Sequence, residues 1–260
     1  MSQSIATMPT LVLLHGWAAH SEFYRPLQAV LNSEIPVLVP DLPGHGVQAD
    51  WEPVPTIQDM ADWLKHYLEE NSVDSFIIVG WSMAALVAYD YIDRYADARL
   101  KGFVSLDMTV KMLNDDEWDL GLYRTFDARK NESAMPFMRD NWPKYSESIA
   151  KVFFAEGREP TEYDAWMHNE VLKNQGVTMA AIWQSISEQD FRPVLPNINV
   201  PVLIVAGGKS QLYCLEAAEY LVEHIPNAQL LVCEQSGHAP HIEEPERVAE
   251  AIHQCFYPGV

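Results

Sequence analysis

The sequence predicts an α/β fold in which a parallel sheet carries helices on both faces. Six short apolar runs are continuous rather than alternating, which is typical of strands buried on both faces. Segments with apolar residues at helical spacing separate several of these runs. Strands that alternate with helices are joined by right-handed crossovers, so we expect a parallel sheet.

The runs that predict strands cover residues 11–14, 36–39, 76–79, 102–106, 202–205 and 230–233. Helical spacing predicts helices over residues 57–70, 83–95 and 215–224. Only about ten residues precede the first run. We therefore expect six strands, all of them parallel.

The alternation stops between residues 110 and 199, where no strand-like run occurs. This stretch is helical in pattern and holds Trp118, Trp142, Trp166 and Trp183. We expect residues 1–109 and 200–260 to form the core domain and residues 110–199 to form a helical cap insertion over one end of the sheet.

Composition excludes several partners. The formal net charge of −20 repels nucleic acid backbones and anionic lipid surfaces, so neither is expected as a partner. No segment approaches the roughly 18 apolar residues of a membrane span. Three cysteines without a framework spacing fit a reducing compartment, and we expect a cytoplasmic protein.

Polar residues that could catalyse a reaction or bind a ligand directly follow the apolar runs. In a parallel sheet the carboxyl ends of the strands meet at one rim, where ligands bind. The residues expected on that rim are His15, Asp41, Ser82, Asp107, Ser210 and His238.

Residues 79–85 fit a strand–turn–helix elbow that exposes a nucleophile, with Ser82 at its tip. Such a turn needs small neighbours, here Gly80 and Ala84, and the usual pattern G-x-S-x-G has alanine at its last position. The alternative is that Ser82 is only the N-cap of the following helix.

Four motifs carry a resemblance to a known family. They are Leu14-His15-Gly16-Trp17, Asp41-Leu42-Pro43-Gly44-His45-Gly46, Gly80-Trp81-Ser82-Met83-Ala84 and Gly237-His238-Ala239-Pro240-His241-Ile242-Glu243-Glu244-Pro245. In order and spacing they resemble the α/β-hydrolase superfamily, particularly its small esterases, lactonases and cofactor-free haloperoxidase-like members. Two of the motifs, around Trp17 and Trp81, also resemble pimeloyl-carrier-protein methyl ester esterases.

The resemblance implies a catalytic machinery. Ser82 would attack an acyl carbonyl, and His238 would take its proton and later protonate the leaving group. The backbone N–H groups of Trp17 and Met83 would form the oxyanion hole. His15, His45 and His241 are read as structural.

The triad acid departs from the common pattern, because the loop after residues 202–205 holds Ser210 and no carboxylate. Asp107 follows the preceding strand, where some family members carry the acid, and we assign it this role. The alternatives are that Asp107 only caps its turn and that Glu216, another carboxylate or no acid serves His238.

The cap aromatics predict an apolar substrate pocket, although most residues of such a set pack within the cap itself. The pocket candidates are Trp81, Trp142, Phe153, Trp166 and Trp183. The sequence contains no P-loop, metal motif or dinucleotide fingerprint, so neither a cofactor nor a metal is implied.

These observations favour a serine hydrolase that cleaves a carboxylic ester, lactone or thioester of a largely apolar small molecule through an acyl-serine intermediate. Two alternatives stay open: a cofactor-independent dioxygenase that uses a His–Asp pair on the same fold, and a non-catalytic ligand-binding protein. Oligomeric state is left open.

Overall fold

The computed structural model describes residues 8–259, which form one six-stranded sheet. Its strands are β1 (Thr10–Leu14), β2 (Val37–Leu38), β3 (Phe76–Trp81), β4 (Leu100–Leu106), β5 (Val202–Gly207) and β6 (Ala228–Cys233). They lie in the order β2-β1-β3-β4-β5-β6, and every neighbouring pair is parallel. The predicted six-stranded, all-parallel sheet is confirmed.

The strand limits differ from the apolar runs in a way that backbone hydrogen bonding explains. β2 has only two residues where the run has four. Pro36 directly before it and Pro40, one residue beyond Val39, have no backbone N–H group to extend the pairing. β5 extends beyond its run to Gly207, which pairs with Cys233 of β6. Small turn residues at the carboxyl edge are thus part of the sheet.

The structure has ten α-helices among the described residues. They are α1 (Arg25–Val30), α2 (Ile57–Glu70), α3 (Met83–Tyr95), α4 (Ala128–Asp140), α5 (Trp142–Val152), α6 (Glu162–Leu172), α7 (Gly176–Ser187), α8 (Leu215–His224), α9 (Pro240–Glu243) and α10 (Pro245–Phe256). Short 3₁₀ helices are η1 (Ser21–Tyr24), η2 (Gly46–Gln48), η3 (Leu122–Arg124) and η4 (Leu195–Asn197). The predicted ranges of α2, α3 and α8 are confirmed. Thr56 and Asp59 fix the start of α2 with a capping box.

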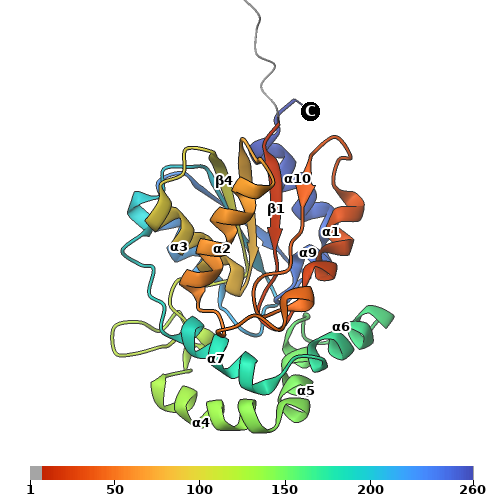
Figure 1. The fold of residues 1–260 in the computed structure, drawn as a ribbon, viewed down its shortest axis with the longest axis vertical. Coiled ribbons are helices and arrows are strands. Elements are labelled where there is room, and N and C mark those ends of the chain that lie inside the picture. Colours follow the sequence, from red (N-terminus) through yellow and green to blue (C-terminus); the bar gives the residue numbers. More distant parts are fainter. Residues whose placement is uncertain (1–7, 260) are drawn as a thin grey trace, which may run out of the picture.

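Helices cover both faces of the sheet. In Figure 1, α2 and α3 lie on one side of the strands, while α1, α9 and α10 lie on the other. β3 is buried along its whole length, as expected of a strand covered on both faces. No helix among residues 8–259 is both long and apolar enough to cross a membrane.

Helices α4 to α7, residues 128–187, lie together at one end of the molecule, beyond the carboxyl ends of the strands (Figure 1). We call them the end helices. α4 packs on α7 and α5 packs on α6. Their position places a helical layer over the rim where the candidate residues were predicted. The division into a core and an insertion at residues 110 and 199 stays a prediction.

Candidate active site

Ser82 lies in the sharp turn between β3 and α3, with φ 54° and ψ −122°. A backbone in this region costs about 1–3 kcal/mol and is typical of functional sites. The neighbours must be small, because a Cβ atom on Gly80 would lie 2.7 Å from the carbonyl oxygen of Ala84, and one on Gly16 would lie 3.1 Å from Ser82 Cβ. The Ser82 side chain makes no capping hydrogen bond to α3, so its hydroxyl does not serve as the N-cap.

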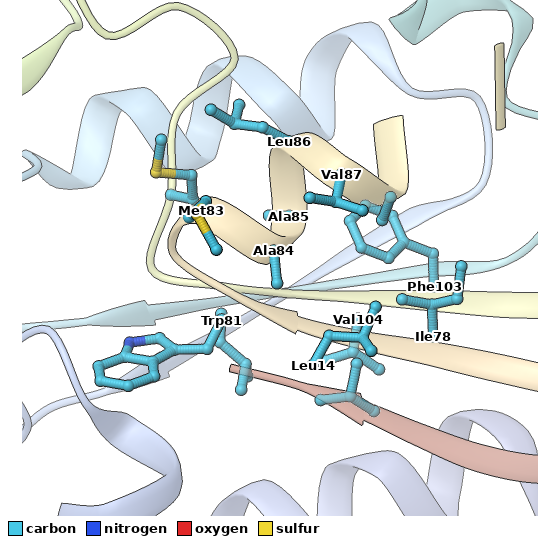
Figure 2. Close-up of a cluster of buried hydrophobic side chains, with 14 of the residues drawn as sticks. Leu14, Ile78, Trp81, Met83, Ala84, Ala85, Leu86, Val87, Phe103 and Val104 are labelled. Atoms are coloured by element: carbon cyan, nitrogen blue, oxygen red, sulfur yellow. The ribbon is translucent and has the colours of Figure 1, made fainter. Parts of the chain in front are cut away.

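A buried apolar cluster supports this turn. Figure 2 shows residues 83–87 of α3 packed over Ile78 of β3 and over Phe103 and Val104 of β4. All of these side chains are almost completely buried. The N-terminus of α3 is therefore held firmly against the sheet beside Ser82.

His238 and Asp107 form a buried hydrogen-bonded pair. The distance from His238 Nδ1 to Asp107 Oδ2 is 2.7 Å, and the two side chains are 2% and 3% exposed. Asp107 has φ 46°, a left-handed conformation that turns it at the end of β4. Its other oxygen, Oδ1, accepts the N–H of Gly207 at 2.9 Å.

The other residues considered for the acid position lie in different surroundings. Glu216 forms an ion pair with Arg124 at 2.9 Å and is 55% exposed. Ser210 lies beside Asp107, and its hydroxyl donates to Asp107 Oδ2 at 2.7 Å. Among the described residues, Asp107 is the carboxylate in contact with His238.

Backbone hydrogen bonds join the residues of the site to the sheet, and each bond links the end of one strand to its neighbour. Ser82 N–H donates to Leu106 O at 3.0 Å, beside the end of β4. Asp107 N–H donates to Val205 O of β5 at 2.8 Å, and Gly208 N–H donates to Cys233 O of β6 at 2.8 Å. The spacing between Ser82 and Asp107 thus follows from strand register.

Two contacts that sequence reasoning did not find hold the loop of His238. The indole of Trp81 donates to the carbonyl oxygen of His238 at 2.7 Å. The carboxylate of Glu243 accepts the N–H of Gly237 at 2.6 Å and the N–H of Ala155 at 2.9 Å. Burial raises the pKa of Glu243. The signal for Glu243 was its place in the motif that follows His238.

Ser82 and His238 line one cavity of about 310 Å³ between the sheet and the end helices. Its walls are mainly apolar and aromatic, with Trp17, Met83, Met108, Met112, Leu122, Tyr123, Phe126, Tyr145, Ile149, Val152, Phe153, Trp183, Ile186, Leu212 and Tyr213. Sequence reasoning did not select Met108, Met112 or Tyr213, which follow the ends of β4 and β5 and could have been found by that position.

Of the five aromatic residues predicted for the pocket, Phe153 and Trp183 line this cavity, and the Phe153 ring stacks on His238 with ring centroids 6.1 Å apart. The other three lie elsewhere. Trp81 is buried against His241 on the other side of the turn. Trp142 and Trp166 are also absent from the lining of this cavity.

Trp142 lies behind the cavity wall, where its ring packs edge-on against Trp17 and its indole donates to Val171 O at 3.2 Å. Trp166 packs on Phe23, with ring centroids 5.2 Å apart. Both side chains join the end helices to the core instead of facing Ser82.

Trp17 and Met83, the predicted oxyanion donors, both border the cavity. Met83 is the first residue of α3, where backbone N–H groups have no partner within the helix. Neither backbone N–H group bonds to another residue in the described part of the chain. Both are free to bind a ligand oxygen.

Three other histidines are buried scaffold. Burial lowers the pKa of His15 to about 4 and that of His45 and His241 to about 3. His15 Nε2 accepts the N–H of Leu42 at 2.9 Å and so holds the loop after β2.

Asp41, the other residue predicted on the rim, accepts backbone N–H groups from Ser21 at 2.7 Å and Val47 at 2.8 Å. It borders a separate cavity that does not include Ser82. Asp41 therefore shapes a loop beside the site. Within residues 8–259, no cluster of three or more His, Cys, Asp or Glu side chains could hold a metal ion.

The chain matches known proteins over nearly its whole length. The sequence model described as the alpha/beta hydrolase family matches residues 11–251. Pimeloyl-[acyl-carrier protein] methyl ester esterases from Nitrosomonas europaea and Aromatoleum aromaticum are 24% and 28% identical to it, covering 95% and 94% of this chain and 94% and 96% of their own. The solved esterase of Exiguobacterium antarcticum superposes with a TM-score of 0.86 at 22% identity, covering 96% of this chain and 92% of its own.

Proposed function

We propose that this chain, which belongs to the alpha/beta hydrolase family, is an ester-hydrolysing enzyme like the relatives it resembles, and that it acts as a serine hydrolase through an acyl intermediate on Ser82. Its substrate is the carboxylic ester, lactone or thioester of a small, largely apolar molecule. The observation that carries the proposal is the buried His238–Asp107 pair at 2.7 Å, in the same cavity as Ser82.

The proposed reaction begins at the scissile carbonyl. Ser82 Oγ attacks the carbonyl carbon while His238 Nε2 takes the hydroxyl proton, and Asp107 stabilises the imidazolium that results. The backbone N–H groups of Trp17 and Met83 bind the oxygen on which negative charge develops. His238 then returns the proton to the leaving alcohol or thiol, and water releases the acid in a second cycle of the same steps.

The cavity supports an uncharged, apolar substrate. The methionine and aromatic walls have few charged neighbours, and the formal net charge of −20 disfavours a strongly anionic ligand. We propose that residues 110–199 act as a cap, because end-helix residues such as Phe153 and Trp183 close the cavity above Ser82.

Asp107 also favours a second candidate. An acid after β4, hydrogen-bonded to His238, would equally serve a cofactor-independent dioxygenase that uses a His–Asp pair. In that reaction the His–Asp pair abstracts a substrate proton and Ser82 only positions the substrate. Oxygen uptake with a heteroaromatic hydroxy-ketone, retained in Ser82→Ala, is the result that this candidate predicts.

The decisive test compares hydrolysis of p-nitrophenyl acetate and butyrate by the wild type and Ser82→Ala. We expect turnover by the wild type and a loss of roughly 10,000-fold or more in the variant, since the nucleophile is removed. A fluorophosphonate probe should label the wild type on the peptide that holds Ser82.

Two results would contradict the proposal: turnover that survives in Ser82→Ala, or no turnover and no labelling of a folded wild type. The first favours chemistry by His238 and Asp107 alone. The second favours a binding protein.

A further inference from the structure

Within the proposed hydrolase, we propose that Ser210 is a positioning residue of the catalytic triad that also sets the basicity of His238. Its hydroxyl and the His238 imidazole bond to the same oxygen of Asp107. Ser210 would therefore act on the base through the acid, without touching the substrate.

The hydrogen bonds around Asp107 divide unequally between its two oxygens. Oδ1 accepts one bond, from Gly207 N–H at 2.9 Å. Oδ2 accepts two, from Ser210 Oγ at 2.7 Å and from His238 Nδ1 at 2.7 Å. The three donors approach the carboxylate from β5, from the loop after it and from the loop after β6, so they fix its plane.

The direction of the Ser210 hydroxyl proton is also fixed. The backbone N–H groups of Leu212 and Tyr213 point at Ser210 Oγ from 3.4 Å and face its lone pairs. The Ser210 N–H is bonded to Gly207 O at 3.1 Å, which holds the residue in the turn after β5. The hydroxyl proton is left for Asp107, which as a carboxylate can only accept.

Asp107 is the dominant charge beside His238. The Tyr213 ring lies beside the imidazole with centroids 5.8 Å apart, and burial raises the pKa of its phenol above the usual value. His241 lies nearby on α9, where burial lowers its pKa to about 3, so both groups are neutral at pH 7. Glu243 lies behind the loop, on the N–H of Gly237. The proton affinity of the imidazole therefore depends mainly on the charge that Asp107 presents to it.

A second donor on Oδ2 stabilises the carboxylate and withdraws charge from the oxygen that faces the imidazole. Loss of the Ser210 hydroxyl should leave more charge for His238. The imidazolium is then stabilised and the pKa of His238 rises. Asp107 also loses one of three orienting bonds, so the rate at the pH optimum falls.

The test is the pH profile of kcat/KM for p-nitrophenyl butyrate in the wild type, Ser210→Ala and Ser210→Thr. We expect Ser210→Ala to lower the plateau about tenfold and to move the acid limb upward by about half to one pH unit, the size expected when part of the free energy of one hydrogen bond to a charged group reaches the imidazole. Ser210→Thr keeps a hydroxyl and should return the limb to its wild-type position.

Ser236→Ala is the matched control. Ser236 is buried in the neighbouring loop and also donates to a carboxylate, Glu244 Oε2, at 2.6 Å. Its hydroxyl donates to Glu244 and not to a triad side chain, so the acid limb of Ser236→Ala should stay at its wild-type position. The role of Ser210 would be overturned if the acid limb of the pH profile were unchanged in Ser210→Ala, or if it moved equally in Ser236→Ala.

An NMR titration of the His238 imidazole separates this inference from the proposed function, because it needs no turnover. A higher pKa in Ser210→Ala than in the wild type supports Ser210 even if another reaction is catalysed. An equal pKa in the two folded proteins refutes it even if Ser82 proves to be the nucleophile.

Discussion

Two residues at the centre of the site, Ser82 and Asp107, have positive φ angles of 54° and 46°. The strain at Ser82 was predictable, because Gly80 and Ala84 mark an elbow that needs small neighbours. The strain at Asp107 has no such signature, since aspartate adopts this conformation without special neighbours. Asp107 was found only by its place at a strand end, which is why the sequence left other acids open.

The role of Asp107 as the acid can be tested by moving the carboxylate to position 210. Asp107→Asn should lower kcat by about 10,000-fold, because an amide neither stabilises the imidazolium nor selects the correct tautomer. Ser210 Oγ lies 2.7 Å from the oxygen that His238 contacts, so a carboxylate at position 210 can approach the same imidazole. Asp107→Asn combined with Ser210→Asp should recover at least tenfold over Asp107→Asn, measured with p-nitrophenyl butyrate.

Glu216→Gln is the control for this experiment, because Glu216 is the exposed alternative acid. It should keep wild-type activity. Full activity in a folded Asp107→Asn protein would show that Asp107 is not the acid.

At the scale of elements, Glu243 joins α9 to the chain segment that follows α5. Its carboxylate binds Gly237 N–H, one residue before the base, and Ala155 N–H, two residues after Phe153 of the cavity wall. There is no spare room between these segments, because a Cβ atom on Gly237 would collide with the backbone of Phe154. Glu243 therefore links the loop of His238 to the cavity wall.

Glu243→Gln should both destabilise the protein and reduce its activity. An amide group has one acceptor oxygen, so one of the two N–H groups loses its partner at a cost of about 1–3 kcal/mol. We expect the melting temperature to fall by several degrees and kcat to fall with it.

Glu250→Gln changes an exposed glutamate on α10 and should alter neither the melting temperature nor kcat. A melting temperature for Glu243→Gln equal to that of the wild type would show that the hydrogen bonds to Glu243 do not contribute to the stability of the protein.

The sequence predicts the secondary-structure elements better than it predicts the directions in which their side chains point. The strands could be predicted because burial on both faces makes their residues continuously apolar. The helices α2, α3 and α8 could be predicted because burial of one face imposes a helical period on their apolar residues. Which aromatic residues face the cavity depends on how each end helix is rotated against the core. Trp166 illustrates this: its helix, α6, turns it onto Phe23 and away from Ser82.

At the scale of the whole molecule, buried neutral histidines make stability depend on pH. The pKa of His15 is about 4 and those of His45 and His241 are about 3 in the folded protein, all below the usual 6.5. Below pH 6.5 the unfolded chain takes up protons that the folded chain does not. Their contribution to stability is complete above pH 6.5 and is lost as the pH falls toward about 4 for His15 and about 3 for His45 and His241.

We expect the urea midpoint to fall between pH 7 and pH 5, measured by circular dichroism. His241→Phe should flatten this dependence, because neither ring nitrogen of His241 has a hydrogen-bond partner in the described structure and its ring packs against Trp81 and Tyr24. His66→Gln, at an exposed position, serves as the control and should keep the wild-type slope. Equal midpoints from pH 7 to pH 5 would contradict the expectation.

The staggered backbone bonds from Ser82, Asp107 and Gly208 to the next strand along have a consequence for cooperativity. Ser82 and Asp107 are each at the same time part of the hydrogen-bond ladder between neighbouring strands. The nucleophile and the acid therefore cannot loosen through a local fluctuation of their loops alone, since their amides open only when the strands part. We therefore expect order at Ser82 and Asp107 to be lost together with the pairing of β3, β4 and β5.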